Sequence, residues 1–243
     1  MLQTRSSKIA IGATILALIV VVLGAYTRLT DSGLGCPDWP GCYGNFIAPY
    51  GDFEAHVEML HRYIAGSLGL VILYLMYLFR NSQRCLSWSI GALVIFQAAL
   101  GMWTVTEKLL PIVVSSHLVG GLAIVALLFL LSLKSIAHPP TALRASNKLL
   151  WLINTALLIL MIQIILGGWT STNYAALACP DFPTCYGEFF PELDLANVFV
   201  FDKFIPTTNA RITIHMLHRF GALIITILLS ILLANIFINK SKY

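Results

Sequence analysis

The chain has 243 residues, of which 58% are hydrophobic and 11% are charged. Soluble domains carry roughly 25% charged residues, and so apolar a chain excludes a soluble globular protein and indicates a polytopic membrane protein. The net charge of +4 comes from basic residues in the predicted inner loops, so it indicates no nucleic-acid partner.

Six segments free of Lys, Arg, Asp and Glu are long enough to cross a bilayer, and each predicts a transmembrane helix. They cover residues 9–27, 63–79, 86–106, 110–133, 149–170 and 220–239. The first segment is not a signal peptide, because its apolar stretch is too long and Tyr26-Thr27-Arg28 follows it in place of a small-residue cleavage site. We therefore predict an all-α polytopic membrane protein with six transmembrane helices.

The basic residues predict how these helices are oriented. Nine Lys and Arg residues, with no acidic residue among them, fall in the segments on the side of the N-terminus, and six fall on the other side. By the positive-inside rule, both termini are expected in the cytoplasm, and the loops after the first, third and fifth segments on the outer side of the cell inner membrane. Membrane lipid is thus one expected partner.

One sequence pattern occurs twice, each time before a His-Arg pair that opens a long apolar stretch. Residues 36–44 read CPDWPGCYG, and residues 179–187 read CPDFPTCYG. Met-Leu-His-Arg follows the first copy at residues 59–62 and the second at residues 216–219. A repeat that pairs cysteines with a histidine at a membrane boundary indicates a duplicated cofactor-binding unit.

The repeat predicts three parts of the chain. Residues 1–135 are expected to form an N-terminal four-helix haem-binding repeat, residues 136–147 a cytoplasmic linker, and residues 148–243 an incomplete C-terminal repeat of two helices. A four-helix bundle is the smallest common bundle with an enclosed interior, and cofactors sit between its facing helices.

Four cysteines lie in the predicted outer loops, at Cys36, Cys42, Cys179 and Cys185. An oxidising compartment permits disulfides, and the two prolines inside each interval favour turns that bring the sulfurs together. A zinc site is the weaker alternative, because each pair has five residues between its cysteines. Cys85 lies on the inner side and is expected to stay reduced.

Three histidines lie near the outer ends of predicted helices. His61 and His117 are expected in the first turns of alternate helices of one bundle, at similar depth, where two imidazoles can approach one iron from opposite faces. His218 repeats the position of His61 in the second copy. The alternative for each is a polar contact inside the membrane, although ionisable groups there usually serve a function.

Glu58 precedes His61 by three residues, so the two side chains share a helix face. A carboxylate beside the cofactor can stabilise a cationic intermediate or take a proton from an oxidised carbon. The alternative is an ion pair between Glu58 and Arg62 at the membrane interface. The second copy has His215 at the position of Glu58, so only the first copy places an acid beside its histidine.

Three arginines near the outer boundary are candidates to bind haem propionates by charge-assisted hydrogen bonds. They are Arg28, Arg62 and Arg219. Snorkelling toward the interface explains their positions equally well.

These residues resemble the haem A synthase family of the cytochrome oxidase assembly pathway. The resemblance is carried by the contiguous residues 24–40, by residues 58–62 and by residues 116–118. It implies eight helices in two pseudo-symmetric four-helix halves, each able to hold a haem near the outer surface. It also implies that one ring methyl of haem O is oxidised, through hydroxylated intermediates, to the formyl group of haem A.

The resemblance implies roles for single residues. His61 and His117 correspond to the haem ligands of the substrate-side half, Glu58 to its catalytic carboxylate, and His218 to one ligand of haem b in the other half. Cys36–Cys42 corresponds to the outer-loop disulfide, and Cys179 and Cys185 to a second pair present in part of the family. The implied partners are the haem substrate, haem O synthase, an electron acceptor and a second copy of the chain.

The family's eighth helix supplies the second ligand to haem b, and this sequence predicts six helices. The chain is thus expected to lack the last two helices: it is a fragment, or another subunit supplies them, or only the first half binds haem. A fragment is the favoured explanation. Two other functions stay open, a non-catalytic haem-binding cytochrome or assembly subunit, and a quinone-linked disulfide-forming protein.

Overall fold

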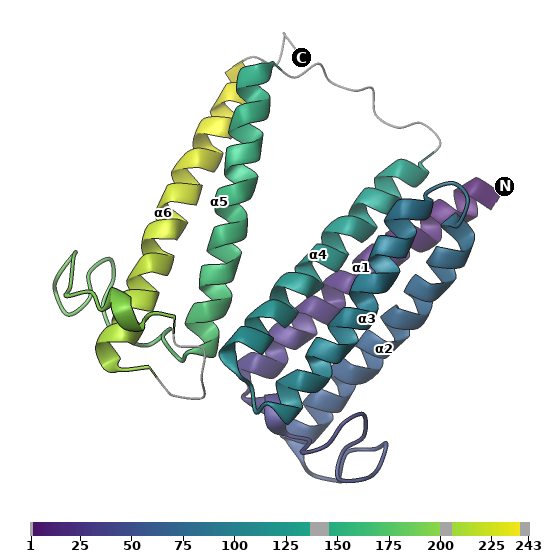
Figure 1. The fold of residues 1–243 in the computed structure, drawn as a ribbon, viewed down its shortest axis with the longest axis horizontal. Helices are drawn as coiled ribbons and strands as arrows, with labels where there is room; N and C mark the ends of the chain where they lie inside the picture. Colours follow the sequence, from purple (N-terminus) through teal and green to yellow (C-terminus); the bar gives the residue numbers. More distant parts are fainter. Residues whose placement is uncertain (1, 137–145, 200–205, 239–243) are drawn as a thin grey trace. The chain divides into compact units, whose positions relative to one another are not determined.

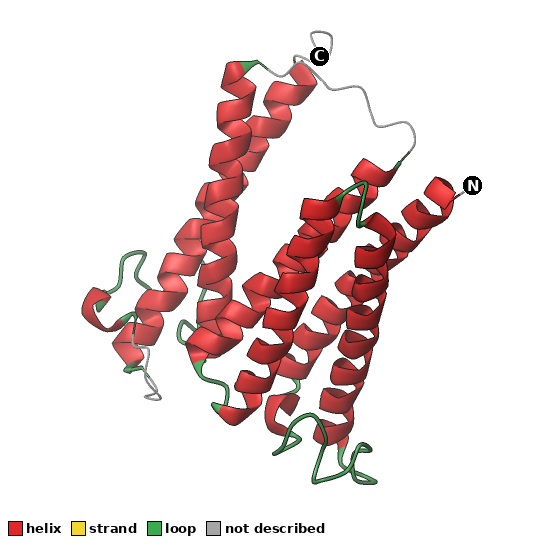
Figure 2. Cartoon of the chain, turned by 45° about the vertical axis from the view of Figure 1, so that its right-hand side comes forward, coloured by secondary structure: helices red, strands yellow, loops and turns green. Residues whose placement is uncertain are grey.

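The structure, a computed structural model, describes residues 2–136, 146–199 and 206–238, and these residues are helical or form loops (Figures 1 and 2). Six long helices are α1 (Leu2–Leu29), α2 (Phe53–Phe79), α3 (Arg84–Thr106), α4 (Pro111–Ser135), α5 (Asn147–Thr172) and α6 (Thr208–Ile238). Two short 3₁₀ helices, η1 (Ser32–Leu34) and η2 (Leu195–Asn197), lie in the loops after α1 and α5. The predicted all-α class is confirmed.

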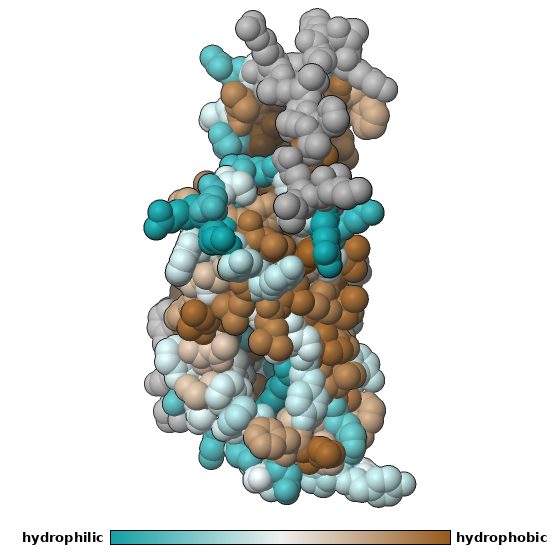
Figure 3. Space-filling model, turned by 90° about the vertical axis from the view of Figure 1, so that its right-hand side faces the viewer, coloured by the Kyte–Doolittle hydropathy of each residue, from teal (hydrophilic) through white to brown (hydrophobic). Residues whose placement is uncertain are grey.

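All six helices are long and apolar enough to cross a membrane, which makes the chain a multi-pass membrane protein. Large apolar side chains on their surfaces are exposed in the isolated chain, as expected for residues that face lipid. Figure 3 shows the first four helices from one side, with an apolar band between hydrophilic groups at both ends.

Two helices begin ten or more residues earlier than the sequence predicts. α2 starts at Phe53 and α6 at Thr208, where the charge-free segments start at 63 and 220. The prediction that His61 lies in the first turn of its helix is therefore wrong, because it lies in the third turn of α2. The predicted helices began after Arg62 and Arg219 because the prediction allowed no charged residue. Both arginines nevertheless lie within helices, because loop carbonyls bind their guanidinium groups.

Residues 1–140 form the first unit, in which the four helices make a ring. α1 packs against α2 and α4, and α3 packs against the same two helices, so α2 and α4 lie diagonally opposite each other. Ala10, Ala13 and Ala17 are buried on α1, and such small residues let a neighbouring helix approach closely. Thr14 and Ser132 add a hydroxyl contact of 3.1 Å between α1 and α4.

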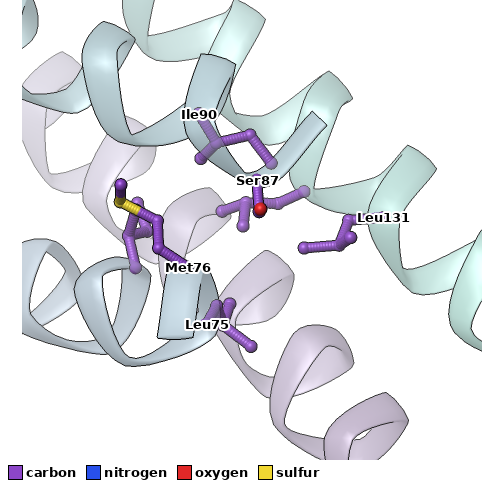
Figure 4. Close-up of a pocket in the computed structure, with 7 residues that line it drawn as sticks. Leu75, Met76, Ser87, Ile90 and Leu131 are labelled. Carbon is purple, nitrogen blue, oxygen red and sulfur yellow. The ribbon is translucent and has the colours of Figure 1, made fainter. Parts of the chain in front are cut away.

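The end of this bundle remote from the cysteine loop is packed with apolar side chains. Figure 4 shows Leu75, Met76, Ser87, Ile90 and Leu131 converging from α2, α3 and α4. A Cβ on Gly91 would lie 2.1 Å from the Met76 sulfur, so the glycine lets Met76 pack against α3. This region serves packing, and the histidines lie near the other end of the bundle.

Residues 141–243 form the second unit, in which α5 packs against α6. At the cysteine-loop end of this hairpin, Trp169 is buried and its indole N–H donates to the main-chain carbonyl of Val198 at 2.8 Å. This bond ties the long loop to α5. Most of the predicted linker at 136–147 lies outside the described residues, so the predicted boundaries of the three parts stay a prediction.

Candidate functional site

The two cysteine loops are built alike. Disulfides join Cys36 to Cys42 and Cys179 to Cys185. All four cysteines are buried, and the first pair packs against α2. Thiol–disulfide exchange requires an accessible sulfur, so burial argues against a disulfide-forming activity and favours a structural role. The zinc alternative has no ligand set, because the described residues contain no group of three or more His, Cys, Asp or Glu side chains that could hold a metal.

An aspartate closes each loop. The Asp38 carboxylate accepts hydrogen bonds from the main-chain N–H groups of Tyr43 and Gly44, at 2.6 and 2.7 Å. Asp181 binds the equivalent N–H groups and also accepts a bond from the Thr184 hydroxyl. The bond from Gly44 is the main cause that holds the pKa of Asp38 below its ordinary value, and the Thr184 hydroxyl is the main cause that lowers the pKa of Asp181 to about 2.

Arg62 on α2 anchors the first loop. One guanidinium nitrogen donates to the main-chain carbonyls of Asp38 and Gly41, at 2.9 and 2.5 Å, and lies 3.4 Å from that of Pro40. The other nitrogen donates to Glu58 Oε1 at 2.5 Å. The guanidinium group thus donates its hydrogen bonds to loop carbonyls and to Glu58. Its contact with a haem propionate stays a prediction.

Glu58 binds both Arg62 and the first cysteine loop. Its side chain is buried, Oε1 pairs with Arg62, and Oε2 accepts the main-chain N–H of Cys36 at 2.8 Å. The ion pair considered from the sequence therefore forms, but it is buried under the loop and not exposed at the membrane interface. Glu58 holds the start of the disulfide loop against α2 one turn before His61.

The second copy repeats the anchor without the acid. Arg219 donates from Nε to His215 Nε2 at 3.0 Å and from a terminal nitrogen to the Thr184 carbonyl at 2.7 Å. His215 thus takes the place of Glu58 as the acceptor on the same helix. Arg28, the remaining predicted propionate ligand, lies at the end of α1, where it pairs with Asp31 at 3.8 Å.

His61 and His117 lie on the diagonally opposite helices of the first unit. Each imidazole packs against a glycine of the preceding helix: a Cβ on Gly24 would lie 3.1 Å from His61 Cε1, and one on Gly101 would lie 3.3 Å from His117 Cε1. The Nδ1 atoms of both histidines are buried and have no hydrogen-bond partner among the described residues.

Neither ring makes a hydrogen bond to a described residue, so each imidazole keeps a nitrogen available as a metal ligand. Two such rings on opposite sides of a bundle match the axial ligation of a haem iron. The site therefore fits the haem that the resemblance implies.

His218 on α6 has the same setting in the second unit. A Cβ on Gly167 of α5 would lie 3.1 Å from His218 Cε1. The Gln163 side-chain nitrogen lies 2.9 Å from His218 Nδ1.

A second repeat, which the sequence analysis missed, places these glycines. The pattern Leu-Gly-x-aromatic-Thr occurs at residues 23–27, 100–104 and 166–170. Its glycine packs against a histidine of the next helix in every copy, on α1, α3 and α5. The threefold pattern is visible in the sequence and would have indicated which helices face the histidines.

The comparisons with known proteins agree with this geometry. The family model COX15-CtaA, described as cytochrome oxidase assembly protein, matches residues 7–54 and 51–242. The chain belongs to this family. It is 43% identical to a haem A synthase of Shewanella oneidensis over 93% of the chain and 77% of that relative.

More distant members of the family agree along most of the chain. A haem A synthase of Neorickettsia sennetsu is 29% identical over 87% of the chain and 75% of the relative. One of Halalkalibacterium halodurans is 28% identical over 94% and 76%. The matched residues include both cysteine loops and all three histidines.

Proposed function

We propose that the chain is an oxidoreductase that converts haem O to haem A for cytochrome oxidase assembly. The observation that supports this most directly is the pair of buried, unpartnered imidazoles of His61 and His117 on diagonally opposite helices. Membership of a cytochrome oxidase assembly family whose relatives include haem A synthases gives the reaction.

In this proposal His61 and His117 bind the iron of the haem substrate from opposite faces. Gly24 and Gly101 hold the rings by leaving no side chain between helix and imidazole. Two axial ligands fix the position and plane of the porphyrin, and the proposed propionate contacts would fix its rotation, which selective oxidation of one ring methyl requires.

Glu58 is the proposed catalytic carboxylate. It lies one turn from His61, and Arg62 and the Cys36 N–H fix its two oxygens. A carboxylate held in this way is ready to stabilise positive charge that develops on the substrate or to accept a proton from it. In this proposal water supplies the formyl oxygen, and conversion of the methyl group to the formyl group then releases protons and electrons, so the proposal includes an external electron acceptor.

We place haem b in the second unit, with His218 as one axial ligand. Gly167 packs against the His218 ring, as Gly24 and Gly101 pack against the histidine rings of the first unit. Bound there, haem b would carry electrons away from the substrate-side half. Arg28, Arg62 and Arg219 are retained as propionate contacts in this proposal.

The proposed location is the cell inner membrane, with both termini in the cytoplasm and the disulfide loops outside. Oxidised, buried cysteine pairs in both loops agree with this side of the membrane. Haem O synthase and a second copy of the chain are the proposed partners in addition to the electron acceptor.

A non-catalytic haem-binding protein is the second candidate, because both oxygens of Glu58 are engaged in anchoring the loop. Substitution of Glu58→Gln separates the two functions. The matched control is Glu54→Gln, which removes an exposed acid in the first turn of the same helix.

Each variant is expressed with a haem O source, and the purified pigment is extracted and identified by mass. We expect haem A or hydroxylated haem O from the wild-type and Glu54→Gln proteins, and retained but unmodified haem from Glu58→Gln. Normal product from Glu58→Gln would remove the catalytic role of Glu58. Unmodified haem from the wild-type protein would favour the non-catalytic function.

A further inference from the structure

Two glutamines that the proposed site does not use bind the candidate ligands. Gln97 lies on α3 and Gln163 on α5, inside membrane-spanning helices where a polar side chain is costly without a partner. The Gln97 side-chain nitrogen donates to the main-chain carbonyl of His117 at 2.5 Å, and that of Gln163 donates to the carbonyl of His218 at 3.0 Å. Each glutamine thus ties its helix to the next one at the level of the histidine.

In the second unit the amide also lies beside the imidazole, with the Gln163 side-chain nitrogen 2.9 Å from His218 Nδ1. The contact common to both units is therefore the hydrogen bond to the main-chain carbonyl of the histidine.

Glycines give the two amides the space they need. A Cβ on Gly120 would lie 2.3 Å from Gln97 Oε1, and one on Gly221 would lie 2.1 Å from Gln163 Oε1. Any larger residue at either position would displace the amide, because real Cβ atoms do not approach so closely. The glycine follows the histidine by three residues in both helices.

The arrangement recurs in two hairpins with different connections. The spacing Gln-x-x-x-Gly on the first helix and His-x-x-Gly on the second is present in α3–α4 and in α5–α6. A cysteine loop joins α5 to α6, whereas a short turn joins α3 to α4. The shared feature of the hairpins is the histidine, so the glutamine serves the histidine and not the loop.

Packing alone does not account for the glutamines. The side-chain oxygens of Gln97 and Gln163 are buried and have no hydrogen-bond partner among the described residues. An unpaired buried acceptor lowers stability, and an apolar residue of the same size would avoid this cost. A role at the histidine explains why an amide occupies both places.

We propose that Gln97 and Gln163 are positioning residues that set the depth of His117 and His218 for haem ligation by binding their main-chain carbonyls. The inference rests on the proposed function, because it takes the two histidines as axial ligands. Neither glutamine takes part in the chemistry: each acts through the histidine that it holds.

The test replaces the amide by an apolar side chain of similar length in Gln97→Met. Haem bound to the first unit is identified as the signal that is lost in His117→Ala. In Gln97→Met we expect this haem to bind about tenfold more weakly, because the main chain of His117 loses the hydrogen bond that holds it. The electron paramagnetic resonance spectrum and the reduction potential of the haem that remains are expected to shift, because both depend on how the axial ligand is held.

Gly120→Ala provides an independent variant, since it keeps Gln97 but forces its amide away from the His117 carbonyl. It should produce the same changes. Gly66→Ala on α2 is the matched control, because a Cβ there meets nothing within 4 Å, and it should leave affinity, spectrum and potential unchanged.

A folded Gln97→Met protein with wild-type affinity, spectrum and potential would overturn the proposal. If Gln97→Met does not fold, the same readouts on Gly120→Ala decide the question in the same way. If instead His117→Ala retains all of the wild-type haem, ligation by His117 is wrong, and the positioning role of Gln97 falls together with the proposed function.

Discussion

Glycine at position 24 decides where the His61 ring can lie. A methyl group there would approach Cε1 to 3.1 Å, closer than ordinary van der Waals contact. The histidine itself was predictable from the repeated Met-Leu-His-Arg sequence, but that repeat carries no information about which helix faces the ring; the contact with α1 is indicated only by the separate Leu-Gly-x-aromatic-Thr pattern.

Gly24→Ala is therefore expected to weaken haem binding in the first unit. Inserting a methyl group into a packed site costs about 1–3 kcal/mol, which corresponds to roughly tenfold to a hundredfold in affinity. Haem titration of the purified apoprotein measures the change. Gly12→Ala on the same helix is the control, since a Cβ there meets nothing within 4 Å. Equal haem affinities of the two variants would contradict the conclusion that Gly24 makes room for the His61 ring.

Asp181 makes the second cysteine loop sensitive to acid. Its pKa in the folded protein is lowered to about 2, chiefly by the Thr184 hydroxyl, while an unfolded aspartate titrates near pH 4, roughly. The folded state thus binds the proton less tightly, so the contribution to loop stability is complete above about pH 4 and is lost as the pH falls toward about 2.

Hydrogen exchange of the peptide that carries the Tyr186 and Gly187 amides measures this loss, because Asp181 accepts both N–H groups. Protection is expected to decrease over that pH interval after correction for the intrinsic exchange rate. Asp181→Asn lacks the titrating group and should show no such decrease, and the same pH profile in both proteins would rule out Asp181 as its cause.

At the scale of elements, the transmembrane segments were predictable and two of their starts were not. The length of the segments without charged residues indicated all six helices, because the thickness of the bilayer core sets the minimum length of a transmembrane helix. α2 and α6 extend further toward the disulfide loops because Glu58, Arg62 and Arg219 are satisfied within the folded loops, which a count of charged residues cannot detect. The cysteine pairing was predictable from the predicted outer location and short interval of each pair.

The anchor between α2 and its loop gives a prediction at this scale. Arg62→Met leaves the Glu58 carboxylate buried without its partner, which costs about 3–5 kcal/mol. Glu58→Gln combined with Arg62→Met should recover part of that loss, because no buried charge remains. Denaturant unfolding of the purified protein in detergent measures the free energies.

Arg219→Met in the second unit is the matched comparison. Its acceptor on the helix is His215 and not a carboxylate, so the loss should be smaller, about 1.5–3 kcal/mol for hydrogen bonds from a charged group. Losses of the same size in the two units would show that the buried carboxylate adds nothing to the anchor.

At the scale of the whole molecule, the basic residues predict which ends of the helices face the cytoplasm. Arg80, Arg84 and Lys134 lie at the ends of α2, α3 and α4 remote from the disulfide loop. Topology of this kind follows from membrane insertion, so no contact within the chain records it. The Leu-Gly-x-aromatic-Thr pattern, by contrast, is visible in the sequence. The pairing of the helices shows that its glycines pack against His61, His117 and His218.

Cys85 reports the orientation directly. It is exposed at the start of α3, and it is the free cysteine among five, the other four being joined in disulfides. If both termini lie in the cytoplasm, a membrane-impermeant maleimide should leave the protein unlabelled in intact spheroplasts and label it fully once the inner face is opened. Tyr50→Cys in a Cys85→Ser background is the control, because Tyr50 is fully exposed in the first outer loop and should react in intact spheroplasts. Labelling of Cys85 before opening would reverse the orientation, and it would place the haem sites and both disulfides on the cytoplasmic side, where such disulfides are rare.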